Sequence, residues 1–499
     1  MSVPGVHSGE RFVPYPEVFA NAGRLARGFA ELGVGAGDSV ALLLRNDVAF
    51  IEASLATVVL GANAVPINWH WRDEEVGYLL GDCDARVLVG HDDLLGALDV
   101  ADGLEVVGVP VPPEIAAAYQ VGESAPVGHR YETWLRELEP WGEPPERAPL
   151  SVIYTSGTTG RPKGVVRTRQ ADEAVSEQLR EFLAGIFGLR EGAVTIIPAP
   201  MYHSAPNAVT LGAAIRTVDQ TLTPRFDAEE LLRLIAQRRA TTVQMVPTMF
   251  VRLLALPEEV RSRHDLSSLE LVVHAAAPCP PAVKAAMIEW LGPVVTEYYG
   301  STETGPVVHC TSEEWLAHPG TVGRAVPGGT VRVYDADGNR LPPGESGDVY
   351  VRVDAVPEFT YRNDDAKRAS IERDGLVTAG DVGYLDEEGF LYLNDRRNDM
   401  IIAGGVNIYP AEIEACLHTL DGVRDAAVFG IPDERMGEAV CAYVDADPAA
   451  GLTADAVRAH VDRHLARYKV PKVVEFRDDL PREDSGKVFK RLLKEPYWQ

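Results

Sequence analysis

The stretch "YTSGTTGRPKG", Tyr154 to Gly164, decides how this 499-residue chain is interpreted. Glycines let a backbone turn tightly and point its N–H groups at anionic oxygens, and hydroxyls and a lysine add further donors. The familiar phosphate loop has the spacing G-x-x-x-x-G-K-[ST], whereas here Arg161 and Pro162 separate Gly160 from Lys163. Because the stretch follows the apolar run "LSVIY" and ends in lysine, it favours a phosphate-holding loop over a plain linker.

Length, composition and charge limit the number of domains and the classes of protein to consider. A chain of 499 residues exceeds what one hydrophobic core usually holds, so we expect at least two domains. The 46% of hydrophobic and 24% of charged residues are typical of a globular protein. A net charge of -27 argues against a nucleic-acid binder and against adhesion to anionic lipid. Anionic small ligands remain compatible with it, since a local site can be basic.

The cysteines and the apolar segments indicate the compartment. The five cysteines contain no C-x-x-C pair, so we expect neither a disulfide framework nor a zinc site. Free thiols suit a reducing cytosol. The N-terminus lacks a basic start followed by an apolar stretch, and the run 53–69 is broken by Asn63, Pro66 and Asn68. We therefore expect a cytoplasmic protein with no signal peptide and no membrane span.

The first part of the chain alternates helix and strand patterns. Helical spacing begins near Val18, and further segments follow in turn: a strand at 38–45, a helix at 48–60, a strand at 64–67, a helix at 74–80 and a strand at 85–90. This alternation predicts an α/β fold of mainly parallel sheets covered by helices. Residues 104–149, rich in Pro, Gly and Glu, are interpreted as a variable surface connection.

The pattern changes twice further along. From about residue 321, strands joined by Asp-Gly and Pro-Gly turns predict a small β-rich subdomain. After Asn398 a new α/β pattern begins, with an amphipathic helix that places Ile413, Cys416, Leu417 and Leu420 on one face. The predicted domains are therefore residues 1–397 and residues 398–499, the second a small mobile α+β domain.

The last segment of the chain reverses the overall charge. Between Arg463 and Lys494 there are ten Lys or Arg residues against five Asp or Glu residues. Such a run is either a solvated basic face or a surface that approaches a polyanion, and the sequence leaves both open.

Several single residues are ambiguous by themselves. A lone Glu303 or Lys487 is more often simply exposed, His203 after an apolar run is more often packed in a core, and Asp381 could cap a turn. The pair Gly404 and Gly405 could be an ordinary β-turn. Their neighbours are more informative than the residues alone.

Six segments together resemble the adenylate-forming superfamily of acyl-CoA synthetases, peptide-synthetase adenylation domains and luciferases. The segment "YTSGTTGRPKGV" resembles its phosphate-binding signature, and the other matching segments follow in the same order: "PMYH" (200–203), "YYGSTETG" (298–305), "AGDVGYLDEEGFLYLNDRRNDMI" (379–401), "GGVNIYPAEIE" (404–414) and "PREDSGKVFKR" (481–491). The resemblance covers nearly the whole chain. It implies that a carboxylic acid attacks the α-phosphate of ATP, releasing pyrophosphate, and that a thiol then takes the acyl group.

The resemblance also implies residue roles. Lys487 would bridge the substrate carboxylate and the α-phosphate, and His203 would lie beside the acyl carboxylate. Glu303 would hold Mg²⁺, and Thr302 would contact the α-phosphate region. Asp381 would bind the ribose with Arg396 as its partner. The remaining expected contacts with ATP and coenzyme A are Thr155, Ser156, Gly157, Thr158, Thr159, Gly160, Lys163, Ala276, Ala277, Pro278, Tyr298, Tyr299 (near adenine), Gly300, Ser301, Gly404 and Gly405.

Two positions depart from the family pattern. The usual T-G-D motif is Ala379-Gly380-Asp381 here, with Thr378 one place early. Asn398 occupies the hinge position, where the family usually has Asp or Lys. A hinge needs only to absorb a backbone change, and Asn tolerates unusual backbone angles, so we expect the domain rotation between half-reactions to be retained.

The substrate expectations come from the predicted pocket. The segment "MYHSAPNAV" has no acid to hold an α-amine, and no carrier-protein domain follows before Gln499. Both points favour a free-standing acid–CoA ligase over an amino-acid-activating domain, with a carrier-protein ligase as the alternative. The segments 203–210, 244–250, 274–279 and 299–308 are mainly small and apolar, which favours a bulky hydrophobic acid: terpenoid or steroid-like, aryl, or medium-chain fatty. A homodimer is compatible with the sequence.

Overall fold

The computed structural model describes residues 3–99, 103–141, 151–155, 162–167, 173–396, 399–403, 406–482 and 488–498. The chain forms two compact units, which are described separately. The first comprises residues 1–244, 260–273 and 354–370, and the second comprises 245–259, 274–353 and 371–499. Among the helices of the described segments, none combines the length and the apolar character needed to cross a bilayer.

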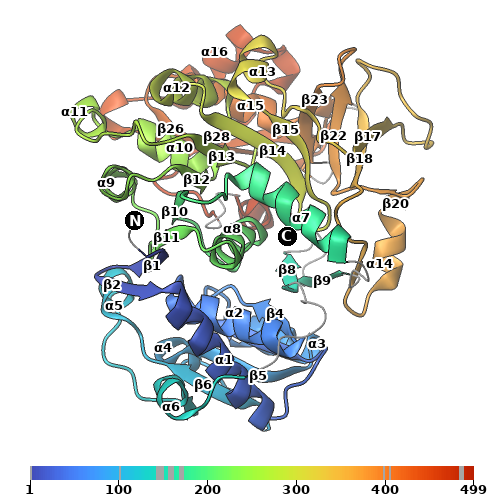
Figure 1. Ribbon diagram of the computed structural model, residues 1–499. Coiled ribbons are helices and arrows are strands. Elements are labelled where there is room, and N and C mark those ends of the chain that lie inside the picture. Colours follow the sequence, from blue (N-terminus) through green and yellow to red (C-terminus); the bar gives the residue numbers. More distant parts are fainter. Residues whose placement is uncertain are drawn as a thin grey trace. The chain divides into compact units, whose positions relative to one another are not determined.

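The first unit contains a fully parallel five-stranded sheet. Its strand order is β4 (Asn63–Pro66), β3 (Ser39–Leu43), β5 (Ala85–His91), β6 (Glu105–Val109), β7 (His129–Arg130). Every residue of β3 is buried, as expected for a central parallel strand covered on both faces. Figure 1 draws this sheet in blue with its helices: α1 (Tyr15–Glu31), α2 (Val48–Leu60), α3 (Asp73–Asp82), α4 (Asp92–Leu95), α5 (Pro113–Tyr119) and α6 (Tyr131–Glu137).

Sequence signals explain where α2 begins and ends. The carboxylate of Asp47 accepts a hydrogen bond from the Val48 backbone N–H, and Gly61 ends the helix in the left-handed conformation. Because ten consecutive residues of α2 are buried, this helix lies inside the unit rather than on its surface.

A second group of strands in this unit is also mainly parallel. Its strand order is β13 (Leu271–His274), β12 (Thr242–Met245), β10 (Val194–Ile197), β11 (Asp219–Leu222), β1 (Gly5–Ser8), β2 (Arg11–Pro14). The pairs β12–β10, β10–β11 and β11–β1 are parallel, and the pair β1–β2 is antiparallel. The helices along this part of the chain are α7 (Glu173–Phe187), α8 (Ser204–Ile215) and α9 (Ala228–Arg238), with α11 (Glu258–Arg261) at the boundary between the units.

A small antiparallel sheet completes the first unit. It has the order β19 (Phe359–Tyr361), β9 (Lys163–Arg167), β8 (Ile153–Thr155), and α14 (Asp365–Ser370) follows β19. Residues 354–370 thus return to β9, the strand that follows the predicted phosphate loop.

The second unit begins with a hairpin and a β-rich part. The strands β14 (Val295–Ser301), β15 (Gly305–Cys310) and β16 (Arg324–Ala325) are antiparallel. A further antiparallel sheet has the order β20 (Glu372–Arg373), β21 (Leu376–Val377), β18 (Gly347–Val353), β22 (Asp381–Leu385), β23 (Leu391–Arg396), with β17 (Gly329–Tyr334) paired to β18. The helices α10 (Pro247–Leu254), α12 (Pro281–Leu291) and α13 (Ser312–Ala317) belong to this unit.

The last hundred residues form their own sheet and core within the second unit. The sheet order is β25 (Val406–Ile408), β24 (Ile401–Ala403), β27 (Gly437–Ala446), β26 (Val423–Asp433), and β28 (Val473–Phe476) adds to β27 in parallel. The helices are α15 (Pro410–Leu417), α16 (Ala454–His464) and α17 (Lys490–Lys494), with short 3-10 turns at Pro448–Ala450, Arg467–Lys469 and Glu495–Tyr497. Ile413, Leu417, Val457 and Val461 pack together with the strands in one apolar core.

The architecture confirms the predicted fold class of helix-covered, mainly parallel sheets, a β-rich part and an α+β C-terminal part. The interpretation of residues 104–149 as a surface connection was wrong over 105–137, where β6, α5, β7 and α6 form. Val107 and Val109 of β6 are buried beside β5, so short apolar strands between proline-rich turns were overlooked. Residues 142–150 lie outside the described part of the chain.

The basic C-terminal segment is largely neutralised within its own unit. Six of its cations form ion pairs with acids: Lys469 with Glu412, Lys472 with Asp433, Arg477 with Glu475, Arg482 with Asp425, Lys490 with Glu414 and Lys494 with Asp399. This pairing favours the solvated-face interpretation over a surface that attracts a polyanion.

Candidate functional site

The predicted phosphate loop joins two strands that the structure describes. Thr155 ends β8 and lies opposite Lys163, the first residue of β9, in antiparallel register. Gly164 lies against the ring of Tyr154, and a Cβ atom there would come within 2.8 Å of two ring carbons, so a larger residue would push the Tyr154 ring aside. Ser156, Gly157, Thr158, Thr159 and Gly160 lie outside the described residues.

Lys163 is held by an acidic partner rather than being a free positive charge. Its ammonium group forms an ion pair with Asp364, which precedes α14, and it lies 5.8 Å from the centre of the Tyr361 ring. The hydrogen bond with Lys163 lowers the pKa of Asp364. Any phosphate that Lys163 binds must therefore share this lysine with Asp364 or displace it.

His203 stands at the N-terminus of α8. Its backbone is extended and its carbonyl accepts a hydrogen bond from Asn207 N–H at 3.0 Å, so it is the first, non-helical residue of the helix boundary. Its ring centre lies 4.3 Å from that of Tyr202, which in turn meets Trp69 edge-on at 4.7 Å. The half-buried imidazole is therefore positioned by packing at a defined place.

Asn46, which the sequence analysis overlooked, fixes the segment before His203. Its side-chain oxygen accepts from Met201 N–H at 2.9 Å, and its amide donates to the carbonyls of Ala199 and Thr223 at 3.0 and 3.1 Å. Asn46 is buried, so these three bonds satisfy an otherwise costly polar group. A polar residue between the apolar strand "VALLL" and helix α2 was the signal that could have revealed it.

In the second unit, three predicted nucleotide contacts meet. The Tyr299 hydroxyl donates to Asp381 Oδ2 at 2.7 Å, and Arg396 Nε lies 3.6 Å from Asp381 Oδ1. Asp381 and Arg396 are direct cross-strand partners at the ends of β22 and β23. Burial, and then the neighbouring carboxylate, raise the pKa of Tyr299 far above its ordinary value, which keeps this hydroxyl a proton donor.

The displaced threonine before Asp381 has a defined task. The hydroxyl of Thr378 accepts a hydrogen bond from Gly380 N–H at 3.0 Å, and Gly380 has a positive φ of 86°. Thr378 thus stabilises the turn that leads into Asp381, even though Ala379 occupies the place where the family usually has threonine.

Thr302 and Glu303 occupy the tip of the β14–β15 hairpin. The register pairs Ser301 with Gly305, so these two residues lie in the turn between the strands, and both are half-buried. Bonds between Ser301 and Thr304 brace the turn, including Ser301 N–H to Thr304 Oγ1 at 3.0 Å. A Cβ atom at Gly300 would lie 1.9 Å from the Gly305 carbonyl oxygen, so only glycine allows this approach.

The hairpin rests on a buried ion pair that sequence reasoning missed. Lys284 Nζ of α12 lies 2.6 Å from Glu297 Oε2 of β14, and both side chains are almost fully buried. The imidazole of His274 lies 3.7 Å from the same oxygen, and burial lowers its pKa well below the ordinary value. A charged residue inside the apolar strand "VVTEYY" was the available signal.

The segment that follows β13 carries the other predicted nucleotide contacts. Ala276 has a φ of 77°, a left-handed value that costs a residue with a Cβ atom roughly 1–2 kcal/mol. Ala276 and Pro278 are exposed, and Ala277 is half-buried. Tyr298, in the middle of β14, is half-buried as well. Strained backbone that persists in a structure often marks a functional site.

Other predicted residues lie outside the described part of the chain. These are Lys487, Asn398, Gly404 and Gly405. The residues beside Lys487 are described: Arg482 and Val488 pair in an antiparallel bridge, and Arg482 Nε donates to Asp425 Oδ2 at 2.7 Å. The residues beside Asn398 are also bonded, since Asp399 N–H and Met400 N–H both donate to the Arg396 carbonyl.

The groups present fit a nucleotide with a metal ion. Asp381 Oδ1 has no closer partner among the described residues than the Arg396 nitrogen at 3.6 Å, so it can accept a hydroxyl. Glu303 offers carboxylate oxygens at a turn, the ligand type that Mg²⁺ prefers. Arg396 supplies a positive charge beside Asp381.

Comparison with known proteins supports this chemistry. Residues 4–357 match the family model described as AMP-binding enzyme, and residues 412–487 match the AMP-binding enzyme C-terminal domain. The chain is 33% identical to the long-chain-fatty-acid–CoA ligase FadD13 of Mycobacterium tuberculosis, over 97% of this chain and 93% of the relative. It is 31% identical to the fatty acid–[acyl-carrier-protein] ligase ScoC of Streptomyces coeruleorubidus, over 100% and 94% of the two chains.

A solved structure agrees over the whole chain. The crystal structure of ATP-bound MatB from Rhodopseudomonas palustris superimposes with a TM-score of 0.85 at 29% identity, covering 100% of this chain and 97% of that one. The two family models together match well over half of the sequence. The chain therefore belongs to the family of AMP-binding enzymes.

Proposed function

We propose that the protein joins a hydrophobic carboxylic acid to the thiol of coenzyme A in two steps driven by ATP. The observation that carries this proposal is the group of Tyr299, Asp381 and Arg396 beside the hairpin strand that leads to Thr302 and Glu303. This group offers a ribose acceptor, a cation and a metal ligand in one unit. The family membership supplies the reaction class.

The first step forms an acyl-adenylate. A carboxylate oxygen of the acid attacks the α-phosphorus of ATP, the bond to the β-phosphate breaks, and pyrophosphate leaves. Asp381 accepts a ribose hydroxyl through Oδ1 while Tyr299 orients the carboxylate through Oδ2. Lys487 and Arg396 counter the negative charge of the transition state, as oriented cations do in other sites. Bound at Glu303, Mg²⁺ would supply charge neutralisation of the phosphate oxygens.

The second step forms the thioester. The thiol sulfur attacks the acyl carbonyl, the bond to the AMP oxygen breaks, and the thiol proton goes to solvent. We propose that His203, fixed between Tyr202 and the start of α8, positions the acyl carboxylate rather than acting as a general base. The chain would function as domains 1–397 and 398–499 that rotate at Asn398 between the steps.

The nature of the acid rests on the segment after β13. Ala276 and Ala277 are small and leave surface open, which suits a bulky apolar group. Met245, Met249 and Val307, which lie in the segments expected to line the acyl pocket, are 1, 3 and 0% exposed. The names of FadD13 and ScoC as fatty-acid ligases favour a fatty acid among the hydrophobic classes.

A carrier protein is the second candidate acceptor. The similarity to ScoC, whose name specifies an acyl carrier protein, favours this alternative. It keeps the first step and replaces coenzyme A by a phosphopantetheine arm, so only the acceptor needs to be tested.

Mass spectrometry of products tests both candidates. The protein is incubated with MgATP, coenzyme A and a panel of fatty, aryl, bile-type and terpenoid acids. An acyl-CoA of one class supports the proposal and identifies the substrate. AMP and pyrophosphate without an acyl-CoA, followed by acylation of an added carrier protein, would establish the alternative. Absence of AMP with every acid class would contradict the proposed reaction.

A further inference from the structure

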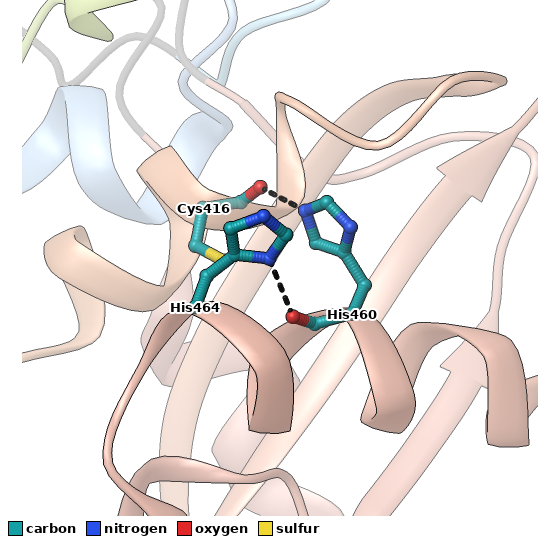
Figure 2. Close-up of side chains that lie close together, drawn as sticks. All are labelled: Cys416, His460 and His464. Atoms are coloured by element: carbon teal, nitrogen blue, oxygen red, sulfur yellow. Dashed lines mark hydrogen bonds between the residues drawn. The ribbon is translucent and has the colours of Figure 1, made fainter.

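One cluster of metal-ligating side chains lies apart from the residues discussed above. Cys416 comes from the end of α15, and His460 and His464 come from α16. The sulfur and one ring nitrogen of each histidine lie within 4.8 Å of one another. Figure 2 shows the three side chains gathered in one place. A zinc site was not expected from the sequence, because the five cysteines contain no C-x-x-C pair.

We propose that Cys416, His460 and His464 bind a borderline-soft divalent cation of the Zn²⁺ type. Two histidines four residues apart on a helix lie on the same face, and their ring centres are 4.3 Å apart. A set of one thiolate and two imidazoles suits Zn²⁺, with a fourth position left for water or a small anion. The proposal does not depend on the proposed ligase function.

The hydrogen bonds of His464 prepare it as a ligand. Its Nδ1 lies 2.8 Å from the His460 carbonyl oxygen, which can only accept, so Nδ1 must carry the proton. The neutral ring then has its lone pair on Nε2. Metal-binding histidines usually have their other nitrogen bonded in this way to a backbone carbonyl or carboxylate, which fixes the ring.

To bind a metal ion, His460 would have to give up its present hydrogen-bond partners. Its Nε2 now lies 3.1 Å from the Cys416 carbonyl oxygen and 3.0 Å from the Thr419 hydroxyl. The Thr419 hydroxyl also donates to that carbonyl at 2.7 Å. Because a carbonyl only accepts, Nε2 carries the ring proton in this arrangement, and metal binding through Nε2 requires that proton to move to Nδ1. The Cys416 carbonyl would then keep the Thr419 hydroxyl as its donor.

The distances require a small contraction. Tetrahedral Zn²⁺ with Zn–S near 2.3 Å and Zn–N near 2.0–2.1 Å places ligand atoms about 3.5 Å apart. The present atoms spread to as much as 4.8 Å. Cys416 is buried in the apolar core, whereas His464 is exposed, so the contraction can come from a tilt of the His464 ring within its present rotamer, which keeps the Nδ1–H bond to the His460 carbonyl. The contraction of the ligand distances would therefore come mainly from movement of His464.

The bound ion would link two helices of the same core. Cys416 and Leu417 end α15, and Val457 and Val461 of α16 pack on the same cluster. A metal ion that binds only the folded arrangement stabilises it by mass action. We therefore expect Zn²⁺ to raise the unfolding temperature of the C-terminal part.

Cobalt spectroscopy and zinc competition test the site. Full-length protein without a histidine tag is titrated with Co²⁺, whose tetrahedral complexes show visible d–d bands and, with a thiolate ligand, a near-ultraviolet charge-transfer band. Zn²⁺ should displace one equivalent of Co²⁺, measured against a chromophoric chelator. We expect Cys416→Ser to abolish the charge-transfer band and His464→Gln to weaken Zn²⁺ binding by at least tenfold.

Matched controls separate loss of a ligand from loss of fold. Cys441→Ser removes another buried cysteine of the same unit, and His129→Gln removes an exposed histidine elsewhere. Both should bind Zn²⁺ as the unaltered protein does and retain its Zn²⁺-dependent rise in unfolding temperature. Because His464 is exposed, His464→Gln should fold normally even if Cys416→Ser does not. Equal Zn²⁺ affinity of His464→Gln and the unaltered protein, or a Co²⁺ complex without the thiolate band, would overturn the proposal.

Discussion

Asp381 lies where two strand ends, a tyrosine hydroxyl and a guanidinium meet. Its Oδ2 accepts from Tyr299 at 2.7 Å, while Oδ1 faces Arg396 Nε at 3.6 Å, too far for a hydrogen bond. One oxygen is thus used to fix the side chain and the other is left to a ligand. The side chain is only 13% exposed, so its orientation is set before a ligand arrives.

Replacing Asp381 by Asn tests its proposed contact with ATP. The amide keeps the shape and can accept from Tyr299, but it loses the charge that strengthens a hydrogen bond to a hydroxyl. A hydrogen bond to a charged group contributes roughly 1.5–3 kcal/mol, so we expect KM for ATP to rise about 10- to 100-fold. KM for the thiol should stay unchanged. Asp337→Asn, in an exposed turn, is the control, and an unaltered KM for ATP in Asp381→Asn would exclude the ribose role.

Lys487→Ala tests the second residue-scale proposal. Removing a cation that stabilises the charge of the transition state should slow acyl-adenylate formation roughly 100- to 1000-fold. Thioester formation from a supplied acyl-adenylate should stay nearly unchanged, because that step creates no comparable charge at the α-phosphate. The two half-reactions are measured separately by quenched flow. Equal losses in both steps would show that Lys487 has another role.

At the scale of elements, Asn398 lies between strand β23 and the C-terminal sheet. The residues on its two sides are tied together by bonds from Asp399 and Met400 N–H to the Arg396 carbonyl. Asp395 Oδ2 in turn accepts from Ala411 N–H at 2.8 Å, at the first turn of α15. A rotation at Asn398 that separates these groups would therefore break these hydrogen bonds.

Asn398→Pro tests that rotation. The proline ring locks φ near −65° and so limits the backbone changes available to a hinge. We expect adenylation to proceed at the normal rate and thioester formation to slow at least tenfold. Asn398→Gly, which keeps backbone freedom, should leave both steps near normal. Unchanged thioester kinetics in the proline variant would mean that the chain does not pivot there.

The elements also show what local sequence can and cannot reveal. Helix α2 was predicted with its observed bounds from its continuous apolar run, and the structure shows that Asp47 and Gly61 cap it at those bounds. Strands β6 and β7 were missed, since a five-residue strand among prolines has too little periodicity to stand out. The Cys416–His460–His464 cluster could not be predicted either, because its parts meet only when α15 packs on α16. The residues expected to bind ATP could be named from the sequence because short neighbouring motifs, not distant contacts, define them, and their binding of ATP stays a prediction.

For the whole molecule, buried histidines link stability to pH. His274 is fully buried, its two ring nitrogens have no hydrogen-bond partner among the described residues, and Lys284 of α12 and Glu297 of β14 face it. Phe250 of α10 packs edge-on at 5.1 Å. Desolvation, and then the Lys284 charge, lower the pKa of His274 well below 6.5. At mildly acidic pH the unfolded chain therefore binds a proton at His274, whereas the folded protein does not.

His274→Leu tests this linkage. As the pH falls below about 6.5, the unfolded chain binds a proton at this imidazole and the folded protein does not, so the free energy of unfolding decreases. We expect the unfolding temperature of the unaltered protein to drop between pH 7 and pH 5 more steeply than that of His274→Leu. Thermal melts at matched ionic strength measure the difference. Identical pH slopes in the two proteins would contradict the assigned linkage, and His129→Gln provides a control at an exposed histidine.

The close approach at Gly300 also limits how this enzyme can be diversified. Any side chain there would meet the Gly305 carbonyl oxygen at 1.9 Å, so in a saturation library nearly every variant at this codon should be lost. Ala276 already carries a Cβ atom at its positive φ and Ala277 is half-buried, so unbranched replacements there should meet less steric resistance than any replacement at Gly300. Directed evolution toward new acids can therefore vary the segment after β13 but not Gly300 in the hairpin. A deep mutational scan would show more tolerated replacements in that segment than at Gly300.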